Sequence, residues 1–105
     1  MDPTQIAWAA GLFEGEGCMS FDDNLARIKL SMTDKDVVER FAKIFNLKAN
    51  GPYYYSGHRS HYKPYYVTNS KKQSVVRDIV STLLPYFGDR RAHKALDILD
   101  HLECK

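Results

Sequence analysis

Residues 8–17 read WAAGLFEGEG, and this stretch decides the fold. The chain is apolar all round over residues 6–13, which predicts a helix that is buried on more than one side. One stripe of that helix carries the small residues Ala7, Ala10 and Gly11, and the large apolar side chains lie opposite. The large stripe suits the chain's own core. The small stripe suits a second backbone that approaches closely, so we expect a partner helix there.

Outward from this stretch, the hydrophobic periodicity changes repeatedly between helix and strand. Capping boxes are predicted at the second and third helices, from Thr33 with Asp36 and from Ser70 with Gln73. The expected helices are 3–14, 34–46, 70–84 and one from 88 onward, and the expected strands are 18–23, 25–33, 53–55 and 62–69. The sequence therefore predicts one α+β domain over residues 1–105, of order αββαββα(α). Its antiparallel four-stranded sheet would carry helices on one face and a saddle-shaped surface on the other.

Composition agrees with a single globular domain and excludes several classes of protein. Hydrophobic residues make up 44% of the chain and charged residues 27%, which is too apolar for a disordered protein. No apolar run approaches the roughly 20 residues of a membrane span, and the N-terminal apolar stretch lacks the basic flank of a signal peptide. The two cysteines, Cys18 and Cys104, are too few for a disulfide scaffold, so we expect an intracellular protein.

The net charge of +2 conceals an uneven distribution of charge. Residues 46–77 contain six Lys or Arg and no Asp or Glu. In the predicted strand 25–33, Arg27, Lys29 and Ser31 alternate with apolar residues and therefore share one face. A basic sheet face that no helix covers can enter the major groove of DNA as a β-ribbon. The pattern favours a nucleic acid as the partner.

Residues 8–17 also resemble the LAGLIDADG signature of homing endonucleases. Four positions match that pattern directly, and two glutamates stand where the family usually has aspartates. The matching residues are Ala10, Gly11, Leu12 and Gly17, and the two glutamates are Glu14 and Glu16. The predicted order of elements also resembles that family's domain from end to end, so the resemblance covers nearly the whole chain.

The resemblance implies an activity and its partners. Family members with one copy of the motif are homodimers that cut both strands of a long, near-palindromic DNA site, and the family serves intron or intein mobility. We therefore expect a Mg²⁺-dependent endonuclease that acts on double-stranded DNA, with Ca²⁺ able to replace Mg²⁺ without supporting cleavage. The implied dimer interface lies on the first helix, through Ala7, Ala10, Gly11 and Glu14.

The same resemblance assigns a catalytic centre. Glu16, with Gly15 beside it, takes the place of the metal-binding acid at the end of the motif helix. Mg²⁺ prefers one or two carboxylates plus phosphate oxygens and water, and it neutralises charge on the attacking and leaving oxygens. Asp34 stands at a polar-pocket position, and Arg90 and Arg91 stand where the family has a lysine. Arginine can hold a phosphate but does not deprotonate, so we expect charge stabilisation there and no proton transfer.

The expected DNA contacts combine the basic strand face, the second hairpin and the start of the helix that follows it. They are Ser20, Asp22, Arg27, Lys29, Ser31, Arg59, Lys63, Tyr66, Thr68, Lys71 and Lys72. About half of the six tyrosines between positions 53 and 66 should lie in the core, because strands alternate faces.

Two other functions are compatible with the sequence. The first is a relative of the endonucleases that binds DNA or RNA, as a splicing helper or a regulator, without cutting it. The second is an interaction protein with a basic patch, which leaves the small-residue helix and its terminal acid unexplained. A zinc site at His58 and His61 is not expected, because structural zinc takes four protein ligands and no cysteine pair lies nearby.

Overall fold

The computed structural model describes residues 2–103, which form four α-helices and a four-stranded sheet. The elements are α1 (Pro3–Glu16), β1 (Gly17–Asp22), β2 (Leu25–Met32), α2 (Lys35–Ile44), β3 (Asn50–Tyr53), β4 (Tyr65–Ser70), α3 (Gln73–Leu83) and α4 (Asp89–Glu103). Two single-turn 3₁₀ helices, η1 (Gly57–Arg59) and η2 (Leu84–Tyr86), precede β4 and α4. The predicted α+β order of elements is confirmed.

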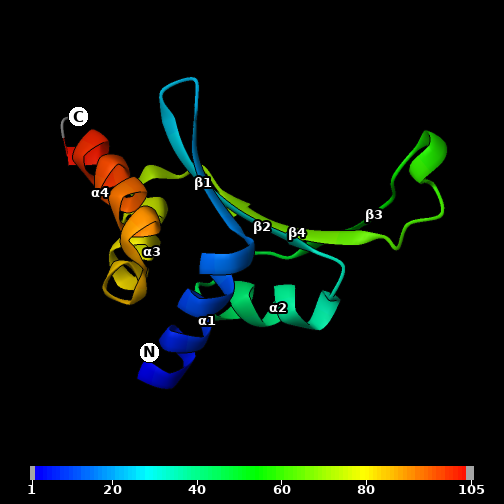
Figure 1. The fold of residues 1–105 in the computed structure, drawn as a ribbon, viewed down its shortest axis with the longest axis horizontal. Helices are drawn as coiled ribbons and strands as arrows, with labels where there is room; N and C mark the ends of the chain where they lie inside the picture. The colour runs from blue at the N-terminus through cyan, green and yellow to red at the C-terminus, as the bar shows by residue number, and fades with distance from the viewer. Residues whose placement is uncertain (1, 104–105) are drawn as a thin grey trace.

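The strands form one antiparallel sheet in the order β1-β2-β4-β3. The helices pack on one side of this sheet, and the opposite side is concave and carries no helix (Figure 1). The turn between β1 and β2 rises at one end of the concave side, and the loop between β3 and β4 projects at the other end. We call this helix-free side of the sheet the open face.

Helix α1 begins where the sequence predicts and ends two residues later than expected, at Glu16. The Asp2 Oδ1 atom accepts a hydrogen bond from the Thr4 N–H (2.9 Å), and a proline occupies the first helical position, where no N–H is needed. The helix passes directly into β1 at Gly17, where a Cβ atom would overlap the ring of Phe13. Glycine therefore permits the close packing of the strand start against the helix.

The buried face of α1 differs from the predicted one. Ile6, Ala9, Ala10 and Phe13 are buried in the chain's own core, whereas Trp8 is only partly buried. Ala10 is 1% exposed, so its assignment to a dimer interface is wrong. The close-packed interior of this chain needs small side chains where its own elements approach α1, and Ala9 and Ala10 supply them.

Neither predicted capping box forms at the start of α2 or α3. Asp34 precedes α2, and its side chain makes no capping hydrogen bond. Lys72 precedes α3, and Gln73 points instead to the neighbouring strand. The Gln73 Nε2 group donates to the Ala26 carbonyl (2.9 Å), and its Oε1 accepts from the Ala26 N–H (3.0 Å). This side chain therefore ties α3 to β2.

The second hairpin is shorter and more irregular than expected. Residues 54–64 form a long loop between β3 and β4, so the predicted strand at 53–55 ends at its first residue. Gly51 has a φ angle of +130°, and a Cβ there would lie 2.9 Å from the Tyr65 carbonyl oxygen. Pro52 cannot donate a hydrogen bond to the ladder, which an edge strand such as β3 tolerates.

The structure also bears on the membrane and cysteine predictions. No helix in residues 2–103 is long and apolar enough to cross a membrane. Cys18 is an exposed free cysteine on β1. Cys104 lies outside the residues that the structure describes.

Candidate nucleic-acid interface and metal-binding helix end

Strand pairing fixes which side chains point from the open face. Residues directly opposite each other in antiparallel strands lie on the same side of the sheet. The pairs on the open face are Ser20–Arg27, Cys18–Lys29, Lys29–Asn69 and Ser31–Val67. The predicted basic side of β2 therefore lies on the open face, and the apolar residues that alternate with it are buried under the helices.

Arg27 has donor capacity that its own chain does not use. The side chain is partly exposed on the open face, and its Nε atom is buried without a hydrogen-bond partner in the described chain. The exposed part of the guanidinium group can donate to an acceptor on this face. The guanidinium group is therefore suited to a phosphate or base acceptor laid on this face.

Two predicted DNA contacts on β4 are wrong. Tyr66 pairs with Met32 and Thr68 pairs with Leu30, so both side chains lie on the helix side of the sheet. Thr68 is fully buried, and its hydroxyl group has no hydrogen-bond partner among the described residues. The prediction is off by one residue, which moves every side chain of a strand to the other face. The β4 residues on the open face are Tyr65, Val67 and Asn69.

Asp22 and Lys71 form an ion pair between the end of β1 and the segment before α3. The hydrogen bond and the charge of Lys71 lower the pKa of the Asp22 carboxyl below its ordinary value of 3.8, and the charge of Arg27 acts in the same direction. Both partners of the pair are about half exposed. The pairing neutralises Lys71, so this lysine attracts a phosphate less strongly than an unpaired one.

The other predicted cations lie at the margins of the open face. Arg59 and Lys63 are exposed in the loop 54–64, which projects beyond the sheet (Figure 1). Lys72 is exposed directly before α3. These three side chains can bind phosphates of a nucleic acid that extends beyond the edges of the sheet.

The last turn of α1 offers oxygen atoms to a cation. Glu16 is the final residue of the helix, and its side chain is exposed. The final carbonyl groups of a helix lack partners within it, and Gly15 carries one of them with no side chain to cover it. The negative end of the helix dipole adds to the attraction. A carboxylate with a nearby carbonyl suits a hard cation such as Mg²⁺.

Glu14 links the end of α1 to the start of α4. Its Oε1 atom accepts a hydrogen bond from the Gly88 N–H (2.7 Å), and its Oε2 atom is buried without a hydrogen-bond partner in the described chain. The carboxylate therefore makes its hydrogen bond within its own chain, and the place of Glu14 in a dimer interface stays a prediction. The bond holds the segment that carries Arg90 and Arg91 near the end of α1.

The basic start of α4 lines a pocket against β1. Arg90, Arg91 and Lys94 surround it together with Met19, and its volume is about 260 Å³. Three cations near a helix N-terminus attract an anion such as a phosphate. The sequence analysis missed Lys94. Its position one helical turn after Arg90 is the signal that could have found it.

The described residues of a single chain do not assemble a complete metal site. Asp34 is exposed just beyond β2, and its side chain makes no capping bond. Among residues 2–103, no three His, Cys, Asp or Glu side chains converge as metal ligands do. A cation at Glu16 would take its other ligands from phosphate oxygens, water or a second copy of the chain.

The exposed side of α1 has a smooth surface. Ala7, Gly11 and Gly15 repeat at intervals of one helical turn and are all exposed. A Cβ on Gly11 or Gly15 would meet nothing within 4 Å. Beside this strip, the Arg40 guanidinium group lies 3.9 Å from the centre of the Trp8 ring. The strip leaves the helix backbone open to close contact.

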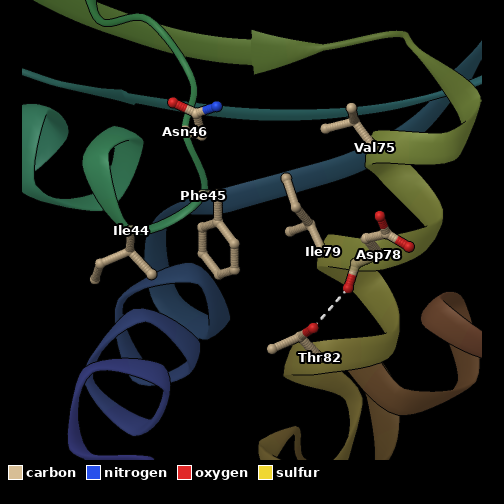
Figure 2. Close-up of a pocket in the computed structure, with 7 residues that line it drawn as sticks. All are labelled: Ile44, Phe45, Asn46, Val75, Asp78, Ile79 and Thr82. Atoms are coloured by element: carbon tan, nitrogen blue, oxygen red, sulfur yellow. Dashed lines mark hydrogen bonds between the residues drawn. The ribbon is translucent and has the colours of Figure 1, made fainter. Parts of the chain in front are cut away.

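A further pocket lies in the helix layer, between the end of α2 and α3 (Figure 2). Its volume is about 260 Å³, and its lining is Ile44, Phe45, Asn46, Val75, Asp78, Ile79 and Thr82. The Thr82 hydroxyl group donates to the Asp78 backbone carbonyl (2.7 Å) and is thereby satisfied within α3. The lining contains no cation, so this pocket lacks the chemistry of the open face.

No family model and no curated protein matches the sequence of this chain. Solved structures match its fold. The homing endonuclease I-CvuI, in complex with its target in the presence of Ca, aligns with a TM-score of 0.71 and 16% identity over 95% of this chain. I-CvuI with the I-CreI target in the presence of Mg, in which the DNA is not cleaved, gives 0.67 and 16% over 95%. The homing endonuclease I-TnaI gives 0.64 and 16% over 93% of this chain and 71% of its own.

The matched part is 66% of the I-CvuI chain in both complexes. At 16% identity the likeness establishes a shared fold. The chain therefore has the α+β fold of homing endonucleases, with an open antiparallel sheet backed by helices.

Proposed function

We propose that this chain is a subunit of a site-specific endonuclease that cuts both strands of a near-palindromic DNA duplex as a homodimer. The open face carries the proposal, because helices back only one side of the sheet and Arg27, Lys29 and Ser31 point from the other. A concave face suits a rod-like duplex, and strands can lie in the major groove. The I-CvuI structures of the same fold contain target DNA, which supports this partner.

In this proposal a Mg²⁺ ion binds at the end of α1. The Glu16 carboxylate and the Gly15 carbonyl would hold it, and their exposure leaves room for phosphate oxygens and water. The bound ion would stabilise the negative charge that develops on the phosphate oxygens during hydrolysis. The presence of Ca or Mg with I-CvuI supports a divalent cation.

Arg90 and Arg91 bind the phosphate that is cleaved. The Glu14–Gly88 bond fixes the start of α4 beside α1, so their pocket lies near the proposed metal ligand. Guanidinium groups grip phosphate with two parallel hydrogen bonds and stay protonated, so they stabilise charge and move no proton. Asp34, exposed just beyond β2, is the further carboxylate that the proposal assigns to this centre.

The second copy packs along the exposed strip of α1 that contains Ala7 and Gly11. Small residues there let two helix backbones approach closely, as helices with small residues at their contact do. Two-fold symmetry brings the two Glu16 side chains toward one axis and matches a near-palindromic site. Like-charged carboxylates favour a cation between them.

A cleavage selection tests the endonuclease proposal. Purified protein is incubated with a library of randomised palindromic duplexes and Mg²⁺, beside Glu16→Gln and a Ca²⁺ control. We expect cut ends that share one sequence, require Mg²⁺ and disappear in Glu16→Gln. Glu39→Gln, at an exposed position of α2, is the matched control and should cut like the wild type. Cutting that survives in Glu16→Gln would contradict the proposed centre.

The second candidate is a nucleic-acid-binding protein of this fold without cleavage activity. Arg90 and Arg91 favour it, because arginine does not transfer protons. Enrichment of one sequence without any cutting would establish it in the same selection.

Salt dependence separates both nucleic-acid functions from a protein-interaction module. If about 6–10 phosphates are contacted, affinity should fall by about 10³–10⁵ between 50 and 200 mM salt. An affinity that does not change over this range of salt would exclude both the DNA endonuclease and the nucleic-acid-binding protein.

A further inference from the structure

Five rings form a continuous aromatic ladder between the sheet and the loop 54–64. The centroid distances are 5.6 Å for Tyr53–Tyr65, 5.0 Å for Tyr65–Tyr55, 5.5 Å for Tyr55–Tyr62 and 4.7 Å for Tyr62–His61. These spacings are those of mutually stabilising aromatic pairs. The loop 54–64 is not paired with any strand, and the ring contacts of the ladder support it instead.

The ladder begins on the open face. Tyr65 is two residues before Val67, which pairs with Ser31, so its ring lies on the side of the basic residues. Tyr53 is the partner of Tyr65 on β3. The loop that carries Tyr55 and Tyr62 projects outward beyond the end of the sheet (Figure 1).

Several rings of this region lie open to solvent. Tyr54 is 73% exposed and takes part in none of the ladder contacts, and Tyr62 and Tyr53 are 51% and 44% exposed. Tyr55 and Tyr65, in the middle of the ladder, are partly buried. Large rings gathered at a surface mark a binding site more often than a solvated one.

The charge around these rings is positive. Arg59 and Lys63 are exposed in the same loop, and no Asp or Glu occurs in residues 46–77. A polyanion can approach without meeting repulsion. The rings attract flat aromatic groups and the cations attract phosphates, and nucleotides carry both groups.

Ring stacking distinguishes unpaired from paired bases. In a duplex each base pair covers the faces of its neighbours, so a protein meets only base edges in the grooves. Unpaired bases offer their faces to tyrosine rings, and such stacking tolerates any base. Exposed rings are therefore better suited to a single strand than to the duplex itself.

We propose that the loop 54–64 binds unpaired nucleotides of DNA or RNA, which stack on Tyr54 and Tyr62 while Arg59 and Lys63 hold their phosphates. The site extends the nucleic-acid binding proposed for the open face and does not depend on cleavage. A strand that leaves a duplex on the open face would pass over the ladder.

Fluorescence anisotropy with four labelled probes tests the site. The probes are a blunt duplex, the same duplex with a single-stranded thymidine overhang, oligothymidylate and oligouridylate. The variants are Tyr54→Leu, Tyr62→Leu and Tyr54→Phe, which keeps the ring but not the hydroxyl group. Tyr86→Leu, at a 49% exposed tyrosine of η2, is the matched control.

We expect each leucine variant to weaken binding of the overhang duplex and of the single strands by about tenfold, the size of one lost stacking contact. Blunt-duplex affinity should stay unchanged, and Tyr54→Phe and Tyr86→Leu should bind like the wild type. The tighter of the two single strands identifies DNA or RNA as the source of the nucleotides.

Three results would overturn the site. In the first, the leucine variants bind the blunt duplex and the overhang duplex equally weakly. In the second, Tyr54→Phe loses binding. In the third, the wild-type protein binds the duplex but neither single strand. In the last case the proposed DNA function is intact. Single-strand binding without duplex binding would instead support the site and contradict the DNA endonuclease.

Discussion

Gly17 has an ordinary φ angle of −82°, so the requirement for glycine there is steric and not conformational. A Cβ would overlap the ring of Phe13, and stacking on Phe41 and Phe87 at 5.8 and 6.3 Å keeps that ring from moving aside. We predict that Gly17→Ala lowers the free energy of unfolding by about 1–3 kcal/mol, as overpacking of a core does. Urea unfolding at matched protein concentration measures the change.

Gly11→Ala is the control for this substitution. A Cβ on Gly11 meets nothing within 4 Å, and alanine favours a helix over glycine by up to about 1 kcal/mol. The variant should therefore be at least as stable as the wild type. Equal losses in both variants would show that the contact with Phe13 does not decide the outcome.

Asp22 provides a prediction about pH. Lys71 lowers the pKa of this carboxyl, so Asp22 stays ionised at pH values where an ordinary aspartate is already protonated. The stabilisation from the pair is present above the ordinary pKa of 3.8 and is lost as the pH falls through the lowered value. In an NMR titration, the Asp22 midpoint should lie below 3.8 in the wild type and move toward it in Lys71→Gln. Identical midpoints in the two proteins would contradict the pair.

Among the elements, strand β4 has one face that affects stability and another that is proposed to contact DNA. Thr68 is buried with an unpartnered hydroxyl group, so Thr68→Val should raise the free energy of unfolding by about 1 kcal/mol and leave DNA affinity unchanged. Asn69 is exposed opposite Lys29, so Asn69→Ala should weaken DNA binding at unchanged stability. Thermal unfolding and duplex titration of both variants measure the two effects. Weaker DNA binding in Thr68→Val but not in Asn69→Ala would place the helix side of β4 on the DNA.

The elements whose orientation was mispredicted share a physical cause. Strand β2 alternates cleanly between apolar and polar residues, so its open face could be predicted from the sequence alone. Strand β4 reads YYVTNS and offers both faces similar side chains, so no hydrophobic pattern fixes which face is buried. Helix α1 is apolar all round, and its periodicity could not tell the core side from the exposed side.

The parts of the site that no local pattern could predict depend on contacts between distant segments. Gln73 bonds to Ala26, and Glu14 bonds to Gly88, across long stretches of chain. The sequence predicts a first helix over residues 3–14 and a last helix from residue 88 onward, and only the resemblance assigns Glu16, Arg90 and Arg91 to one centre. Only the fold shows that the Glu14–Gly88 bond and the stacking of Phe13 on Phe87 link the end of α1 to the segment before α4.

At the scale of the whole molecule, a net charge of +2 does not describe how the protein would meet DNA. The helices cover one side of the sheet, so the polar residues of β2 and the basic loop 54–64 are left on the other side and its margin. A small net charge arranged on one side can direct a nucleic acid to that side.

At the same scale, the proposed dimer depends on the exposed strip of helix α1. Ala10 is 1% exposed, so a leucine there would disrupt the fold and would not report on a partner. Gly11 is exposed with free space around its Cβ position, so Gly11→Leu alters the exposed strip of α1 and leaves the core intact. We predict that the wild type sediments as a dimer and that Gly11→Leu sediments as a monomer with an unchanged circular dichroism spectrum.

Ser81→Leu, at an exposed position of α3, is the matched control and should remain dimeric. Because each copy would cover one half of a near-palindromic site, Gly11→Leu should also lose its preference for the full site over a half-site. A Gly11→Leu protein that still sediments as a dimer would move the interface away from α1. The two Glu16 side chains would then have no reason to meet at one axis, and a cation shared between them would fail with the interface.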